Sequence, residues 1–182
     1  FSRPLDYSKF DLFYAGAQKN MGPSGVTLVV VKETIFNMVK REIPSMLSYK
    51  VHADSGSMFN TPPVFPVYTV LLNLRWIANN GGLEGVGAQN DKKAKLIYDE
   101  IDRNPLFEGF ANTDDRSAMN ATFNLIDESH AAVFDPIWNN ANISGLKGHR
   151  SVGGYRASIY NALSMESAQT LVNCMKEFEK NA

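Results

Sequence analysis

A run of β-branched residues, VTLVVVK from Val26 to Lys32, constrains the fold of this chain more than any other feature. Such a run is typical of a fully buried strand, and a second strand-like segment, SKFDLFYAG from Ser8 to Gly16, precedes it. The nine residues between them, Ala17 to Gly25, include two glycines, a proline and an asparagine. This composition indicates an irregular loop, so the sequence predicts two buried strands that flank one loop.

The segments that follow contain predicted helices. We expect a short helix over residues 33–40 and then a long polar loop from Ile43 to Pro66. A loop of this length in a compact domain more often has a function than not. Apolar residues predict one helix over residues 67–79 and a second over residues 83–103, which Asn104 and Pro105 end. We place a domain boundary between residues 82 and 83.

In the second half, predicted strands alternate with predicted helices, which indicates a small α/β domain. Ser164 is a suitable amino-terminal cap for the last helix, which turns Ala168, Leu171, Val172, Met175 and Phe178 inward. The predicted elements are strands over 118–126 and 151–160 and helices over 128–140 and 164–180. The fold class is therefore α/β with two domains, residues 1–82 and 83–182.

Composition argues against several classes of partner and location. The net charge is -1, so nucleic acid and anionic membranes are not expected partners. The longest apolar runs fall short of the about 20 residues that cross a bilayer. The one cysteine, Cys174, cannot form an intrachain disulfide, which fits a cytoplasmic location. His52 and His130 lack partners at metal-ligand spacing, so no metal is expected. The chain begins at Phe1 without methionine, which suggests a piece of something longer.

Lys19 lies in the loop between the two predicted strands, directly after Gln18. Ligands gather at strand ends in α/β folds. A lysine partly buried there has a lowered pKa, which favours the neutral amine that condenses with an aldehyde. A solvated lysine in a surface turn is the alternative that the spacing leaves open.

Two further segments carry groups that bind anions. The loop DSGSMFNTPP, Asp54 to Pro63, offers hydroxyl, amide and glycine backbone groups to a phosphate, although a plain proline-limited loop has the same composition. The segment KGHRSVGGYRAS, Lys147 to Ser158, is compatible with a site for a phosphate and a carboxylate, or with a solvated basic loop. Its potential cations are Lys147, His149, Arg150 and Arg156.

Three runs in this order resemble one family: YAGAQKNMGPSG (Tyr14 to Gly25), GSMFNTPP (Gly56 to Pro63) and GHRSVGGYRASIYNA (Gly148 to Ala162). They are similar to segments of the phosphoserine aminotransferases, which are class V, fold type I pyridoxal-phosphate enzymes. The resemblance covers essentially the whole chain. It implies that residues 1–82 are the carboxy-terminal part of the large cofactor-binding domain and that residues 83–182 are the small carboxy-terminal domain.

The resemblance also implies an activity. A cytoplasmic homodimer of serine biosynthesis would use pyridoxal 5'-phosphate to exchange an amino group between glutamate and 3-phosphohydroxypyruvate, giving phosphoserine and 2-oxoglutarate. Lys19 would form the Schiff base beside Gln18, which contacts the cofactor phosphate, and Asn60 and Thr61 would reach the phosphate of the partner subunit's cofactor. Arg156 would hold the α-carboxylate, and His149 and Arg150 the substrate phosphate.

The family is about twice as long as this chain. By the resemblance, its amino-terminal half supplies the aromatic residue that stacks on the cofactor ring, the aspartate at the ring nitrogen and further phosphate contacts. The chain by itself is then expected to be inactive or nearly so. Two alternatives stay open: a folded module that only dimerises, and another aminotransferase or lyase of the same fold type. His149 and Arg150 argue against the second, since a site for a substrate with an uncharged side chain has no use for two phosphate donors.

Overall fold

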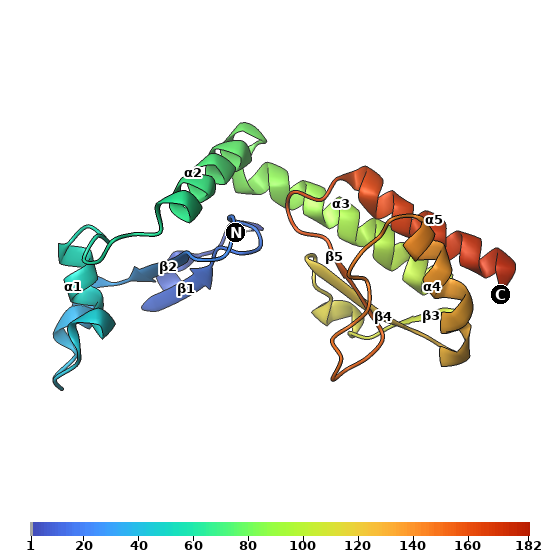
Figure 1. The fold of residues 1–182 in the computed structure, drawn as a ribbon, viewed down its shortest axis with the longest axis horizontal. Helices are drawn as coiled ribbons and strands as arrows, with labels where there is room; N and C mark the ends of the chain where they lie inside the picture. The colour runs from blue at the N-terminus through green and yellow to red at the C-terminus, as the bar shows by residue number, and fades with distance from the viewer. Residues whose placement is uncertain (1) are drawn as a thin grey trace. The chain divides into compact units, whose positions relative to one another are not determined.

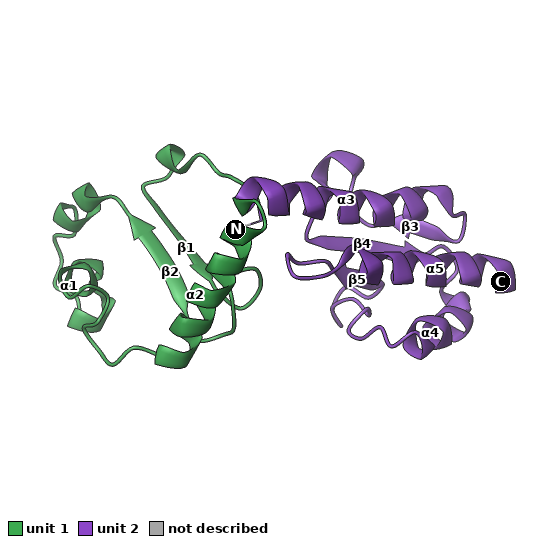
Figure 2. Ribbon diagram, turned by 90° about the horizontal axis from the view of Figure 1, so that it is seen from above, with its two compact units in different colours: residues 1, 3–82 green, residues 2, 83–182 purple. Residues whose placement is uncertain are grey.

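The computed structural model describes residues 2–182 and is mixed α/β, as the sequence predicts. The chain divides into two compact units, residues 3–82 and residues 83–182, and Ser2 groups with the second (Figure 2). Figure 1 labels the elements of each unit. No helix among residues 2–182 combines the length and the apolar content that a bilayer crossing requires.

The first unit is built on a two-stranded antiparallel sheet. β1 (Leu12–Gly16) pairs with β2 (Thr27–Val31) in a register that sets Leu12 opposite Val31. Neither strand contains a buried residue, so the prediction of fully buried strands is wrong for this chain by itself. The reason is that a strand pair buries its faces only under further layers, and the described part of the unit supplies few.

The segment that was expected to be one long loop contains regular structure. A 3-10 turn at Ser45–Leu47 leads into α1 (Tyr49–Asp54), whose N-cap Ser48 accepts a hydrogen bond from the Val51 N–H. α2 (Val64–Asn79) begins directly after Pro63, three residues earlier than predicted. Further 3-10 turns lie at Tyr7–Lys9 and Glu33–Asn37.

The second unit packs helices on a three-stranded antiparallel sheet of order β3-β4-β5. α3 and α5 lie along one face of this sheet, and α4 packs beside α5 (Figure 1). The elements are α3 (Gly82–Arg103), β3 (Phe107–Gly109), β4 (Asn120–Leu125), α4 (Ala131–Asn140), β5 (Tyr155–Ser158) and α5 (Met165–Asn181), with 3-10 turns at Thr113–Asp115 and Glu128–His130. β5 is shorter than the predicted strand over 151–160.

The apolar core belongs to the second unit. Phe107 lies at its centre and makes edge contacts with the rings of Phe123, Phe134 and Phe178 at centroid distances of 5.5, 5.2 and 5.6 Å. All four rings are buried or nearly so. Aromatic pairs in this geometry stabilise a fold beyond their area burial, so this cluster joins the sheet to α4 and α5.

Two charged side chains of α3, Lys93 and Glu100, are buried beside that core. Lys93 of α3 is 2% exposed, and its Nζ donates to the carbonyl oxygens of Tyr160 and Leu163 at 2.8 and 2.9 Å. These carbonyls belong to the turn between β5 and α5, so Lys93 ties that turn to α3. Burial lowers the pKa of the Lys93 ammonium from its ordinary value of 10.5.

This lowered pKa predicts an alkaline gain in stability. Between the folded pKa of Lys93 and 10.5, the unfolded chain binds more protons than the folded one, so the Lys93 contribution to the free energy of unfolding rises with pH. The free energy of unfolding of the parent chain should therefore rise relative to that of Lys93→Met as the pH increases to about 10.5. Urea unfolding at several pH values measures both free energies. Lys95→Met, at an exposed lysine of the same helix that pairs with Asp99, is the control substitution.

Candidate active site

The backbone around Lys19 is held in place from both sides. The Ala17 N–H donates to the Val26 carbonyl at 2.9 Å, and the Ala17 carbonyl accepts from the N–H groups of Lys19 and Gly22 at 2.6 and 2.8 Å. Ala17 and Met21 are buried at 0% and 4% exposure. The loop is thus anchored through its neighbours while the side chain of Lys19 is exposed. Of the two alternatives that the spacing leaves open, residues 2–182 taken alone therefore show the exposed lysine and not the partly buried one.

The same loop packs against α2. Asn73 donates through Nδ2 to the Asn20 carbonyl at 2.8 Å. Gly22 lies so close to α2 that a Cβ placed there would be 2.8 Å from Cγ2 of Val70. A glycine is needed at this close approach, which explains part of the glycine-rich composition of the loop. The position of Lys19 is therefore set by the contact between its loop and α2.

Asn60 and Thr61 lie in the segment that leads from α1 into α2. Both side chains are exposed, and Nδ2 of Asn60 donates to the Thr61 carbonyl at 3.0 Å. They precede by a few residues the start of α2, the helix on which the Lys19 loop packs. Their contact with a cofactor phosphate, like that of Gln18, stays a prediction.

In the second unit, a glycine-closed loop runs from Lys147 to β5. The Gly148 N–H donates to the Gly154 carbonyl at 2.8 Å, and the His149 carbonyl accepts from the N–H groups of Val152 and Gly153, both at 2.8 Å. A Cβ at Gly148 would collide with the Gly153 carbonyl. The two arms of the loop can close this tightly only because position 148 has no side chain.

This loop brings two of the predicted substrate-binding residues together. His149 and Arg156 both line a cavity of about 230 Å³, with Thr122 and Asn124 of β4 on its wall. Arg150, although exposed on the same loop, is not among the residues that line it. The cavity thus joins two side chains that can bind an anion. No cluster of three metal-ligating side chains occurs among residues 2–182.

Lys147, read from the sequence as a fourth cation of this segment, has a structural role instead. Its Nζ lies 2.5 Å from Oδ2 of Asp135 and 3.2 Å from Oη of Tyr155. Tyr155 Oη and Trp138 Nε1 also donate to Asp135 Oδ1, at 2.8 and 3.1 Å. The reading of Lys147 as an anion-binding cation is therefore wrong, since its charge is already matched by Asp135.

The same cluster perturbs two pKa values. Burial alone would raise the pKa of the Asp135 carboxyl, but hydrogen bonds from Lys147, Tyr155 and Trp138 outweigh it and hold that pKa below its ordinary value of 3.8. Burial and the bond to Asp135 raise the pKa of the Tyr155 phenol well above its usual range. Asp135 stays ionised and Tyr155 neutral at pH 7, so the ion pair and hydrogen bonds that join Asp135, Lys147 and Tyr155 hold the base of the loop in place. The sequence held no signal for this role of Asp135, which lies in α4, twelve positions before Lys147.

Ser151 orients the ring of His149. Its backbone N–H donates to Nδ1 at 3.3 Å, and its Oγ lies 2.7 Å from the same nitrogen. An amide N–H can only donate, so Nδ1 is an acceptor and the neutral ring carries its proton on Nε2. We expect ¹⁵N NMR of the 182-residue chain to show this Nε2–H tautomer for His149. Ser151→Ala keeps the N–H contact but removes the shorter Oγ contact to Nδ1, so it should weaken the preference for this tautomer.

The chain offers an internal control for this measurement. Nε2 of His52 lies 3.0 Å from the Met46 carbonyl, which can only accept, so the tautomer of His52 is set independently of Ser151. Its nitrogen shifts should not change in Ser151→Ala. A predominant Nδ1–H tautomer of His149 in the parent chain would contradict the role given to Ser151.

Comparison with known proteins places this geometry in a family. The model of the aminotransferase class-V family matches residues 1–171. The phosphoserine aminotransferases of Flavobacterium psychrophilum and Bacteroides fragilis are 62% and 52% identical to the chain over 98% and 99% of its length. These matches cover 50% and 51% of those proteins, so the chain spans about half the length of the curated relatives it matches.

Solved structures agree. The phosphoserine aminotransferase from Bacillus circulans subsp. alkalophilus superimposes with a TM-score of 0.94 at 48% identity, over 99% of this chain and 50% of that one. A PLP-bound phosphoserine aminotransferase from Trichomonas vaginalis gives a TM-score of 0.89 at 37% identity, over 96% of this chain and 50% of that one. The resemblance drawn from three motifs is confirmed, and the chain belongs to the aminotransferase class-V family.

Proposed function

We propose that this chain is the carboxy-terminal half of a phosphoserine aminotransferase, a pyridoxal-phosphate enzyme of serine biosynthesis. The reaction converts 3-phosphohydroxypyruvate and L-glutamate to O-phospho-L-serine and 2-oxoglutarate. The observation that carries the proposal is the cavity shared by His149 and Arg156, because both substrates are anions. The names of relatives at 62% and 52% identity support the same reaction.

The residues of the first unit fit pyridoxal 5'-phosphate. Lys19 offers a primary amine on a loop whose backbone is anchored through Ala17, while its side chain stays exposed. Lys19 would hold the cofactor through Nζ and would move the proton at the substrate α-carbon. Gln18 would contact the cofactor phosphate, and Asn60 and Thr61 that of the partner's cofactor. When bound, the cofactor supplies the electron sink that stabilises charge at the α-carbon.

Substrate recognition would fall to the second unit. Arg156 would hold the α-carboxylate with its guanidinium fork. His149 and Arg150 would bind the substrate phosphate, with His149 donating from Nε2 because Ser151 occupies Nδ1. A substrate without the phosphate would leave these donors unpaired, which is how polar sites discriminate strongly. This is what favours phosphoserine over the substrates of other aminotransferases of the same fold type.

We also propose a cytoplasmic homodimer with shared active sites. Large apolar side chains of α2 are exposed, with Phe65, Val64 and Tyr68 at 75%, 68% and 55%. An apolar surface of this kind is typical of a contact with another polypeptide. It also keeps open the alternative that this chain acts only as a folded module for dimerisation.

Restoring the full length tests the activity. We would join the chain to the amino-terminal half of the Flavobacterium psychrophilum relative and assay amino transfer from phosphoserine to 2-oxoglutarate. The fusion should bind pyridoxal 5'-phosphate and turn over, whereas the 182-residue chain alone should not, because its family resemblance assigns the ring-nitrogen aspartate to the other half. A folded fusion that binds the cofactor yet turns over only substrates without a phosphate would refute the proposed substrate.

Arg150 gives a sharper test of specificity. In the full-length fusion, Arg150→Ala should lower kcat/KM for phosphoserine by about 10- to 100-fold, since a hydrogen bond to a charged group contributes about 1.5–3 kcal/mol. Cofactor retention, followed by absorbance after gel filtration, should stay unchanged. Lys176→Ala, at an exposed cation of α5, is the control. Equal losses of turnover and cofactor in Arg150→Ala would contradict the role of Arg150.

A further inference from the structure

β5 is an edge strand whose outer side is paired at Tyr155 and Arg156 but open at Ser158. In an antiparallel ladder the backbone groups of successive residues point alternately to the two neighbours. The Ile159 N–H donates inward to the Met119 carbonyl at 2.9 Å, and the Arg156 N–H donates outward to the Leu146 carbonyl at 2.7 Å. By this alternation the Ser158 N–H also points outward. Within residues 2–182 no backbone carbonyl accepts from it.

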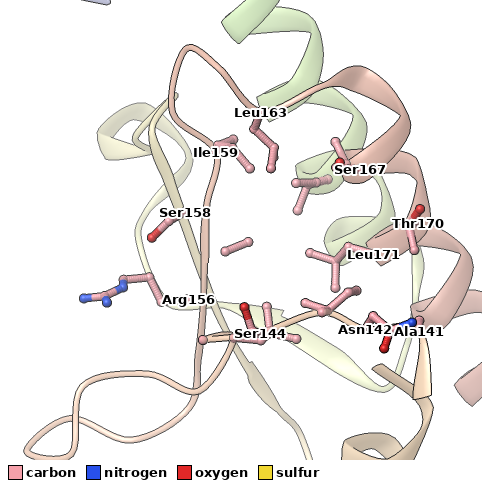
Figure 3. A pocket seen from close by; sticks show the side chains of 16 residues that line it. Ala141, Asn142, Ser144, Arg156, Ser158, Ile159, Leu163, Ser167, Thr170 and Leu171 are labelled. Atoms are coloured by element: carbon pink, nitrogen blue, oxygen red, sulfur yellow. The ribbon is translucent and has the colours of Figure 1, made fainter. Parts of the chain in front are cut away.

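A cavity of about 340 Å³ adjoins this open part of the strand. The loop of residues 141–146 bounds it on one side and α5 on the other (Figure 3). The side chains of Arg156 and Ser158 point away from the cavity, whereas that of Leu171 points into it. Arg156 and Ser158 therefore present their backbone to the cavity, and Ala157, Ile159 and Leu171 give it an apolar wall.

The outward Ser158 N–H and the adjoining apolar cavity would each bind a different kind of group on a ligand. The unpaired Ser158 N–H needs a carbonyl in the plane of the sheet, as a neighbouring strand supplies. The apolar wall needs a hydrophobic group, since protein interiors are otherwise closely packed. An extended peptide meets both needs, because its backbone lies along β5 while alternate side chains point to the core face.

We infer that an extended peptide segment docks on β5 at Ser158 as a fourth strand and inserts a large apolar side chain into the cavity. The segment belongs to the part of the full-length protein outside these 182 residues, so the inference rests on the proposed function. The chain spans about half the length of its curated relatives, which leaves ample polypeptide for this role. A second sheet is a poorer occupant, because Leu146 already covers the edge at Arg156.

Amide hydrogen exchange at Ser158 tests the inference. We would compare the 182-residue chain with the full-length fusion to the amino-terminal half of the Flavobacterium psychrophilum relative. Exchange of the Ser158 amide should be slower by about 100-fold or more in the fusion, because its N–H becomes hydrogen-bonded. The Ile159 amide, already bonded to Met119, should be protected in both proteins. Equal exchange of Ser158 in the two proteins would overturn the inference.

A substitution supplies the second readout. Ser158→Pro removes the outward N–H, a change that edge strands tolerate, and also the Oγ that donates to Oδ1 of Asn120 at 3.2 Å. It should lower the Tm of the fusion by about 2–4 °C and leave the 182-residue chain nearly unchanged. Ser158→Ala keeps the N–H but loses the same Oγ bond to Asn120, so it is the control, and any change of Tm that it causes should be the same in both proteins. Equal losses of Tm in both proteins, or none in the fusion, would count against a docked strand.

The outcomes separate this inference from the proposed function. An inactive fusion with a protected Ser158 amide would refute the activity and support the docked strand. An active fusion with an unprotected amide would do the reverse. Protection that appears in the 182-residue chain as its concentration rises would identify a second copy as the occupant and overturn the inference.

Discussion

Replacing Lys19 with alanine in the full-length fusion is expected to abolish amino transfer, with a loss of at least about 10³-fold in kcat. General acid–base catalysis alone contributes about 10²–10⁴-fold, and Lys19 would also hold the cofactor covalently. The variant should gain no borohydride-fixed cofactor on the peptide that contains position 19, as mass spectrometry would show. Because the side chain is exposed, the substitution should leave the fold intact.

Lys32→Ala is the matched control. Lys32 is a lysine of the same unit, at the end of β2, and its Nζ pairs with Asp11 at 2.7 Å on the surface. An exposed pair of this kind contributes about 0–1 kcal/mol, so cofactor attachment and turnover should persist. Borohydride-dependent labelling of the Lys19→Ala variant at another lysine, with activity retained, would show that the cofactor lysine has been misassigned.

The second unit should fold without the first. A fragment of residues 83–182 is expected to unfold cooperatively with a free energy of about 5–10 kcal/mol, typical of a domain of this size. Its core comprises twenty buried side chains of its own. A fragment of residues 1–82 should show no cooperative transition, because the described part of the first unit buries only Ala17, Met21 and Ile77 among its apolar residues. Far-UV circular dichroism in urea measures both.

A core substitution checks that the transition reports this packing. Phe178→Ala, at a ring with 0% exposure that meets Phe107 and Phe134, should cost about 3–5 kcal/mol in the fragment of residues 83–182. Phe110→Ala, at an exposed ring, should cost far less. A non-cooperative transition of the parent fragment, or equal effects of both substitutions, would show that the second unit depends on the first.

Helix ends were predictable where a local signal sets them. Ser164 caps α5 by accepting from the Ser167 N–H, as expected, and α3 ends at Arg103 before Asn104 and Pro105. Caps and prolines act through neighbours in the chain, so the sequence contains the whole cause. β3 was missed because a strand of three residues, Phe107–Gly109, exists only through its pairing with β4.

The candidate site likewise has features that the local sequence predicts and features that depend on tertiary contacts. The motifs around Lys19, Asn60 and His149 led to the family, and the family match confirms that reading. Lys147 was misread, because the charge that neutralises it comes from Asp135, twelve positions earlier in the chain. Burial of the strands was also misjudged, since β-branched residues indicate which surface must be covered and not which polypeptide covers it.

The sequence by itself determined the fold class, the family, the caps and the glycines that allow close backbone approach, because each depends on residue type and short-range order. Only the tertiary structure decided which cations meet in one cavity, which lysine is buried and which strand edge stays open. Those properties depend on distances between residues far apart in the chain, and these distances are set when the second unit packs its core.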